Sequence, residues 1–186
     1  VHVRPPTSTL PLPKAVAPDE KHTRWDGEKA YVATVAAEGC FLGAALCESA
    51  SEEDLTLGYQ VFHDESQALD PDYEPEVATT DGWGATQTVW QTLFRGLTIL
   101  LCFLHGYLGI KKRCRRDKEL LGEVGERVWN AYDAPSVASF SQRIRRLREW
   151  AEEEVQPLSV KEQILKLCAH RDEYKLGVNN KDVYRT

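Results

Sequence analysis

The sequence contains no methionine, no C-x-x-C pair and no apolar run long enough to cross a membrane. Its five cysteines are scattered and odd in number, which argues against a disulfide framework or a zinc ribbon and favours a reducing cytoplasm. The longest apolar stretch surrounds residues 97–104, far short of the roughly 20 residues of a membrane helix. We therefore expect a soluble cytoplasmic protein without a membrane partner. A chain that begins at Val1 and lacks methionine also suggests a piece of a longer protein.

Positive charge is scarce in the first part of the chain. Residues 1–104 hold 6 Lys or Arg against 16 Asp or Glu, which leaves −10, whereas residues 105–186 hold 17 against 13, which leaves +4. An acidic part can concentrate cations, and a basic part can contact phosphates. An unevenly charged but functionally silent surface would look the same. With 42% hydrophobic and 28% charged residues, the chain has the composition of a folded domain.

The pattern of apolar residues predicts an α/β fold followed by helices. Residues 1–13 are rich in proline and read as an extended lead-in, residues 14–104 as the α/β part, and residues 105–186 as a helical region. The α/β part predicts strands at 14–18, 29–36 and 40–47, a helix from Ser51, a strand at 76–80, a helix at 86–94 and a strand at 97–103. Helices are expected at 106–132, 136–154 and 159–170.

Two aspartates follow predicted strands, where the active sites of α/β sheets lie. Asp19 follows the first strand and Asp81 the fourth. Two carboxylates that converge from neighbouring strands make an oxygen-rich anionic site, which suits Mg²⁺ together with water and substrate phosphates. Paired metals of this kind assist phosphoryl transfer. The alternative is structural, because Asp19 follows Pro18 and Asp81 precedes Gly82, and both pairs are common in turns.

Four segments resemble a group of bacterial insertion-sequence transposases of the DDE superfamily. They are Asp19-Glu20-Lys21-His22, Thr79-Thr80-Asp81-Gly82-Trp83, Ala85-Thr86-Gln87 and Cys102-Phe103-Leu104-His105-Gly106. The resemblance extends over residues 14–186. It implies a ribonuclease-H-like mixed sheet with flanking helices, interrupted by a mostly helical insertion. The order of elements predicted above agrees with that core.

The resemblance also implies roles for individual residues. Asp19 matches the first catalytic acid and Asp81 the second, and together they would hold Mg²⁺ or Mn²⁺. Cys102 and His105 match a C-x-x-H motif, which would place His105 near the DNA or the metal site. Alternatively, Cys102 is a buried strand residue and His105 caps a helix, since one Cys and one His cannot complete a zinc site.

The chain departs from the family at its C-terminus. In the resembled group the third acid follows an Arg-Thr-Ser-Asn-like stretch, whereas this chain ends at Arg185-Thr186. We therefore expect a truncated transposase that lacks the third acid. Glu149 and Glu152–Glu154 read as the solvated face of an amphipathic helix and not as substitutes. An inactive remnant that at most binds DNA, or a nuclease of the same fold that does not transpose, are the alternatives.

A basic segment after His105 is the candidate contact for double-stranded DNA. It comprises five cations in six residues, namely Lys111, Lys112, Arg113, Arg115 and Arg116. Such a segment favours sequence-independent, salt-sensitive binding to phosphates, although a solvated helix face would also fit. A second group, Arg143, Arg145, Arg146 and Arg148, fits either reading equally. The implied partners are transposon ends and target DNA, and a homodimer is possible in this family.

Overall fold

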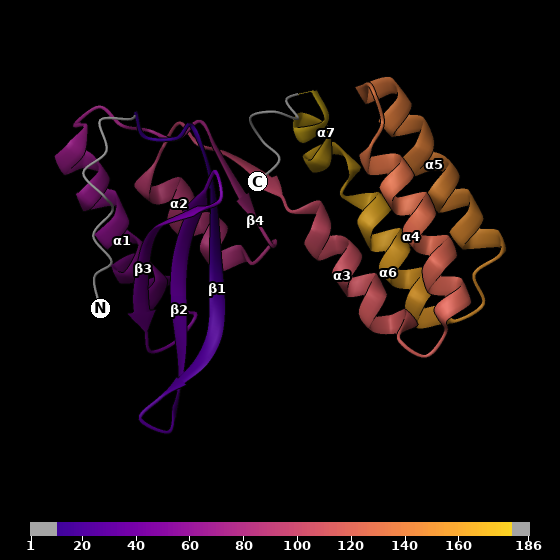
Figure 1. Ribbon diagram of the computed structural model, residues 1–186, viewed down its shortest axis with the longest axis horizontal. Helices are drawn as coiled ribbons and strands as arrows, with labels where there is room; N and C mark the ends of the chain where they lie inside the picture. Colours follow the sequence, from indigo (N-terminus) through magenta and orange to yellow (C-terminus); the bar gives the residue numbers. More distant parts are fainter. Residues whose placement is uncertain (1–10, 180–186) are drawn as a thin grey trace. The chain divides into compact units, whose positions relative to one another are not determined.

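The computed structural model describes residues 11–179 of the 186-residue chain. The chain divides into two compact units, one ending at Leu100 and the other beginning at Leu101 (Figure 1). The first unit contains a sheet with two helices, and the second contains helices. Each unit is described separately below.

The first unit is built on a five-stranded mixed sheet. Strands β1 (Ala15–Trp25), β2 (Glu28–Ala37) and β3 (Cys40–Cys47) form an antiparallel meander, and β1 also pairs in parallel with β4 (Val77–Thr80). With β5 (Thr98–Leu101), the strand order is β3-β2-β1-β4-β5. A meander joined to a parallel strand on its other side is the order of a ribonuclease-H-like core. The expected fold class is therefore confirmed.

Two tight turns connect the meander. Glu38 and Gly39 both have positive φ, at 51° and 78°, as the predicted turn between β2 and β3 requires. Asp26 and Gly27 do the same between β1 and β2, at 50° and 84°. The hairpin between β1 and β2 was not predicted, although Asp-Gly is a strong short sequence signal for such a turn. As a result, β1 and β2 are longer than expected.

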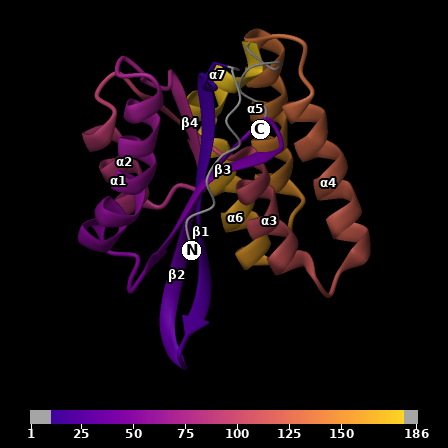
Figure 2. The same ribbon diagram turned by 60° about the vertical axis from the view of Figure 1, so that its left-hand side comes forward.

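Helices α1 (Glu52–Leu69) and α2 (Gly84–Leu93) lie on the same side of the sheet (Figure 2). Ser51 caps α1 as predicted, because its side chain accepts a hydrogen bond from the Asp54 amide at 3.2 Å. Trp90 of α2 is fully buried and stacks on Phe94, with ring centroids 5.3 Å apart. The core therefore lies between the helical layer and one face of the sheet.

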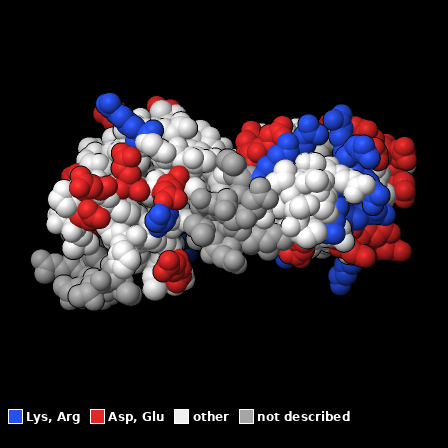
Figure 3. Space-filling view, turned by 90° about the horizontal axis from the view of Figure 1, so that it is seen from above, with Lys and Arg blue, Asp and Glu red and all other residues white. Residues whose placement is uncertain are grey.

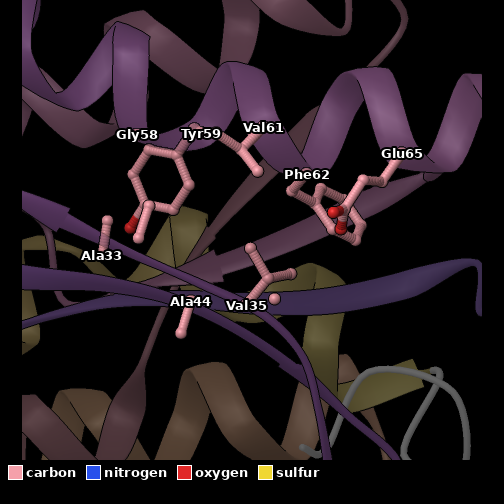
Figure 4. Close-up of a pocket in the computed structure, with 10 residues that line it drawn as sticks. Ala33, Val35, Ala44, Gly58, Tyr59, Val61, Phe62 and Glu65 are labelled. Atoms are coloured by element: carbon pink, nitrogen blue, oxygen red, sulfur yellow. The ribbon is translucent and has the colours of Figure 1, made fainter. Parts of the chain in front are cut away.

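Small residues let α1 approach the sheet closely (Figure 4). A Cβ atom at Gly58 would lie 2.5 Å from the Sγ atom of Cys47, and a Cβ at Gly43 would lie 3.5 Å from Phe62. The narrow space that remains is lined by residues of β2, β3 and α1, including Ala33, Val35 and Tyr59. We attribute it to packing, since its walls are mostly apolar.

The second unit consists of five described helices around one core. They are α3 (Phe103–Cys114), α4 (Lys118–Tyr132), α5 (Val137–Glu153), α6 (Leu158–Ala169) and α7 (Arg171–Asn179). Their shared core includes Phe103, Val128, Phe140, Ile144 and Ile164. Among the described residues, no helix combines the length and the apolar composition that crossing a bilayer requires.

Three boundary predictions in this unit were wrong. The single helix expected at 106–132 is two helices, because Asp117 caps α4 by accepting a hydrogen bond from the Leu120 amide at 3.0 Å. Cys102 is the residue that precedes α3, not a strand residue, and α3 begins at Phe103. Helix α7 was not predicted, because its short sequence carries too few apolar positions to show a helical period.

Candidate functional site

Asp19 lies inside β1, six residues before its end, so the prediction that it ends the first strand was wrong. Pro18 suggested a turn, but the strand continues through it and Pro18 pairs with Val35 of β2. Described pairing of β1 with β4 ends at Val16, so Pro18 is paired on one side, where proline is tolerated in a sheet. Asp19 is exposed at the point where β1 has separated from β4.

Asp81 follows β4 directly, as the sequence predicted. The parallel register pairs Val16 with Ala78. Continuation of this register beyond the paired residues would bring Asp19 level with Asp81. The charges of both aspartates act on the Glu20 carboxyl, which follows Asp19 in β1. Asp81 also closes its own loop, because its Oδ1 atom accepts a hydrogen bond from the Trp83 amide at 2.8 Å.

Side-chain alternation places Asp19 on the open side of the sheet. The hydroxyl of Tyr59, on α1, donates a hydrogen bond to Glu20, so Glu20 faces the helical layer. Successive residues of a strand point to opposite faces. Asp19 therefore faces away from α1 and α2. Asp81 is exposed as well, and the two aspartates make up the acidic pair.

Glu20 is a third carboxyl close to the pair, and sequence reasoning did not single it out. Its half-buried position raises its pKa, and the charges of Asp81 and Asp19 raise it further. Hydrogen bonds from the hydroxyls of Tyr59 and Thr86 oppose this shift in the pKa of Glu20. Burial and the Glu20 charge raise the pKa of Tyr59 in turn. The sequence signal that could have found Glu20 is its position directly after Asp19.

The two exposed aspartates supply some, but not all, of the ligands that a hard divalent cation needs. Within residues 11–179, no three His, Cys, Asp or Glu side chains come together as a group that could hold a metal ion. Asp19 and Asp81 alone supply two carboxylates, which is the usual protein share of a Mg²⁺ site completed by water and substrate phosphates. The donor set therefore fits Mg²⁺ or Mn²⁺ and is unsuited to a closed zinc site.

Cys102 and His105 interact within the helical unit. Cys102 immediately precedes α3, and His105 is in the first turn. Burial alone would raise the pKa of Cys102, but hydrogen bonding and charge from His105 outweigh it and lower that pKa. His105 is exposed. The pair is thus a local contact at the start of a helix, and a role for His105 in binding DNA stays a prediction.

The first basic segment lies where α3 ends and α4 begins. Lys111, Lys112 and Arg113 occupy the last turn of α3, where cations favour the helix dipole. All five cations of this segment are exposed, and none forms an ion pair within the described part of the chain. Helix stability accounts for three of these cations. Arg115 and Arg116, beyond the last turn, have no such structural explanation.

The second basic group is largely occupied by contacts within α5 and with α4. Arg148 pairs with Glu152 at 2.9 Å and Arg145 with Glu149 at 3.5 Å, while Arg143 donates to the Asn130 carbonyl at 2.5 Å. These pairs identify the acidic run as the solvated face of a helix. Arginines engage Glu149 and Glu152 on this face, and their rejection as substitutes for the third acid stays a prediction.

Comparisons with known proteins give weak structural likenesses. No protein-family model matches the chain, and no curated protein matches its sequence. The catalytic domain of the Mos1 mariner transposase matches with a TM-score of 0.37 and 14% identity, covering 92% of this chain and 83% of that domain. A chain of the simian T-cell lymphotropic virus intasome, in complex with PP2A regulatory subunit B56 gamma, matches with a TM-score of 0.37 and 10% identity. That match covers 90% of this chain, which spans about half (54%) of the intasome chain. The fold assignment therefore rests on the strand order.

Proposed function

We propose that this chain is the catalytic-core part of a DNA transposase of the DDE type, from a bacterial insertion sequence. The full enzyme would cut transposon ends and join them to target DNA without a covalent protein–DNA intermediate. The observation that supports the proposal is the parallel pairing of β1 with β4, because continuation of its register beyond Val16 and Ala78 would bring Asp19 level with Asp81. The charges of both aspartates also act on Glu20.

Asp19 and Asp81 would hold the divalent cation through their carboxylate oxygens. When bound there, Mg²⁺ or Mn²⁺ supplies activation of the attacking oxygen and stabilisation of the leaving oxygen in phosphodiester transfer. Glu20 and Tyr59 position these acids, because their hydrogen bond ties β1 to α1 next to Asp19. The Trp83 amide fixes the Asp81 side chain in the loop after β4.

The exposed cations of the α3–α4 junction would bind the DNA backbone. Their partners are phosphates, because unpaired lysines and arginines displace counterions from DNA without reading bases. Binding of this kind is independent of the metal site. Cleavage and binding can therefore be lost separately, and that separation is the basis of the test.

The decisive experiment replaces Asp81 with Asn in the full 186-residue chain. Mg²⁺-dependent cleavage of a DNA duplex should fall by roughly two orders of magnitude or more, because an amide is a poor ligand for a hard cation. Salt-sensitive binding should be unchanged. Asp72→Asn is the matched control, since Asp72 is an exposed aspartate in the loop before β4 and lies outside the acidic pair.

A binding measurement complements the activity assay. Tb³⁺ bound at the acidic pair would be sensitised by Trp83, which is half exposed and two residues from Asp81. Asp19→Asn and Asp81→Asn should each reduce this luminescence, whereas Asp72→Asn should not. Equal luminescence and equal cleavage in all variants would remove Asp81 from the mechanism.

A specific observation favours a second candidate, an inactive remnant that binds DNA. Within residues 11–179 no group of three metal-binding side chains forms, Glu20 is engaged by Tyr59, and Glu149 and Glu152 of α5 pair with arginines. This candidate predicts salt-sensitive DNA binding by the unaltered chain with no Mg²⁺-dependent cleavage. The same assay on the unaltered chain therefore separates the two candidates.

A further inference from the structure

A shallow hollow on the helical unit joins two elements that are distant in sequence. It is lined by five residues from the first half of α5 and one from the start of α7, namely Ala138, Ser139, Ser141, Gln142, Arg145 and Arg171. The lining thus includes two arginines, two serines and a glutamine, and no acidic residue. Figure 3 shows lysine and arginine side chains gathered around uncharged surface over the helical unit, while acids predominate over the sheet unit.

The hollow is formed by helical geometry and by tertiary packing together. Residues 138, 141, 142 and 145 recur at spacings of three and four, so they share one side of α5. Arg171 reaches the same hollow because α7 packs against α5. The small side chain of Ala138 leaves room between the polar groups. The sequence gives no direct sign of this site, since Arg145 and Arg171 are 26 positions apart.

Both arginines are available to an external anion. Their side chains are 66% and 52% exposed, and their ion pairs are long, at 3.5 Å from Arg145 to Glu149 and 3.7 Å from Arg171 to Asp172. Exposed pairs of this kind contribute at most about 1 kcal/mol and exchange readily. A guanidinium matches the geometry of a phosphate better than that of a distant carboxylate. Serine hydroxyls and a glutamine amide add neutral donors of the kind found at DNA phosphates.

We propose that this hollow is a second contact for the phosphodiester backbone of duplex DNA, separate from the segment at 111–116. The proposal rests on the proposed function in taking DNA as the partner. The two surfaces belong to different elements, the segment to the α3–α4 junction and the hollow to α5 and α7, and they share no residue. The contribution of the hollow can thus be measured by itself.

The test compares Arg145→Gln/Arg171→Gln with a matched pair, Arg148→Gln/Lys166→Gln. The control also removes two exposed cations from α5 and a neighbouring helix, but neither lines the hollow. The probe is a fluorescein-labelled random duplex of about two helical turns, titrated at several salt concentrations. The hollow variant should lower the slope of log affinity against log salt by about 1.8, and the control by much less. Arg145→Lys/Arg171→Lys should keep most of the slope.

Equal slopes in the hollow variant and its control would overturn the proposal, as would the absence of salt-sensitive binding by the unaltered chain. The cleavage assay distinguishes these failures from failure of the proposed function. If the slope falls while the unaltered chain shows no Mg²⁺-dependent cleavage, the hollow stands and the catalytic proposal fails. If slopes are equal while Asp81→Asn abolishes cleavage, the catalytic proposal stands and the hollow is wrong.

Discussion

The sheet unit and the helical unit differ in how their charged side chains are arranged. In the sheet unit, acids converge: Asp19, Glu20 and Asp81 interact electrostatically, and one of them is half buried. In the helical unit, Arg148 and Glu152 of α5 form a close pair at 2.9 Å, whereas the cations at 111–116 form no ion pair within the described chain. Charges that stabilise a fold are usually closely paired. The unpaired or loosely paired sets in the two units are therefore the ones to associate with function.

The largest expected effect is on DNA binding by the helical unit. Replacing all five cations of the 111–116 segment with Gln should lower the salt slope by about 4.5 and the affinity by roughly two orders of magnitude or more at low salt. Stability should fall only modestly, because these side chains form no ion pair within the described chain, although three of them favour the dipole of α3 in its last turn. Filter binding or fluorescence anisotropy over a salt series measures the slope.

The sheet unit provides the control for that prediction. Arg24, Lys29 and Arg95 are exposed cations surrounded by an excess of acids. Replacing these three with Gln should leave the slope nearly unchanged. An equal loss per removed charge in both units would mean that binding responds to net charge alone, and the assignment of the segment would fail.

Much of the fold could be predicted from the sequence because its signals are local. Segments that are apolar on both faces located β2 and β3, and Ser51 and Ser136 mark the starts of α1 and α5. Asp81 was placed at the end of β4 for the same reason. By contrast, the extent of β1 depends on its pairing with β2, which overrides the turn preference of Pro18.

The electrostatics of the site could not be predicted in the same way. The pKa of Glu20 is set by its burial, by the hydrogen bond from Tyr59, 39 positions away, and by the charge of Asp81, 61 positions away. The hollow on the helical unit needs α7, a helix too short to show a period in the sequence. Local patterns thus locate elements, whereas contacts between elements decide which side chains meet.

The next largest expected effect is on stability, through glycines whose packing differs between the two units. Gly58→Ala in α1 should destabilise the protein by about 1–3 kcal/mol, because the added Cβ would lie 2.5 Å from the buried Sγ atom of Cys47. Gly122→Ala in α4 meets nothing within 4 Å and should stabilise by up to about 1 kcal/mol through helix propensity. Chemical denaturation of both variants measures the contrast.

A double variant isolates the cause. In a Cys47→Ala background the sulfur is gone, so Gly58→Ala should lose most of its cost. If the loss of stability persists in that background, the close approach of α1 to the Cys47 sulfur in β3 is not its origin.

A smaller effect concerns the half-buried carboxyl of the sheet unit. The pKa of Glu20 is raised in the folded protein above about 4.5, so the folded state binds more protons than the unfolded state just above that pH. Its share of the free energy of unfolding is therefore greatest in acid and falls as pH rises through the folded pKa. Glu20→Gln should match the unaltered chain below pH 4.5 and be more stable at neutral pH, in thermal melts over a pH series.

Glu28→Gln is the control for that prediction, because Glu28 is an exposed carboxyl of the neighbouring strand. Its free energy of unfolding should vary with pH in the same way as that of the unaltered chain. Lower stability of Glu20→Gln at neutral pH would show that the charged hydrogen bond from Tyr59 outweighs the burial of the carboxylate.

The smallest expected effect concerns the paired charges of α5. Arg148 and Glu152 are 64% and 46% exposed and form an i,i+4 pair at 2.9 Å. Such a pair stabilises a helix by about 0.3–0.5 kcal/mol. A double-mutant cycle with Arg148→Gln and Glu152→Gln should give a coupling free energy in that range, which shrinks as salt is added. Because the pair satisfies both charges, neither single variant should change the salt slope of DNA binding as strongly as one cation of the 111–116 segment does. A coupling above about 1 kcal/mol, or a slope loss equal to that of Lys112→Gln, would erase the distinction between paired structural charges and unpaired binding charges on which the comparison of the two units depends.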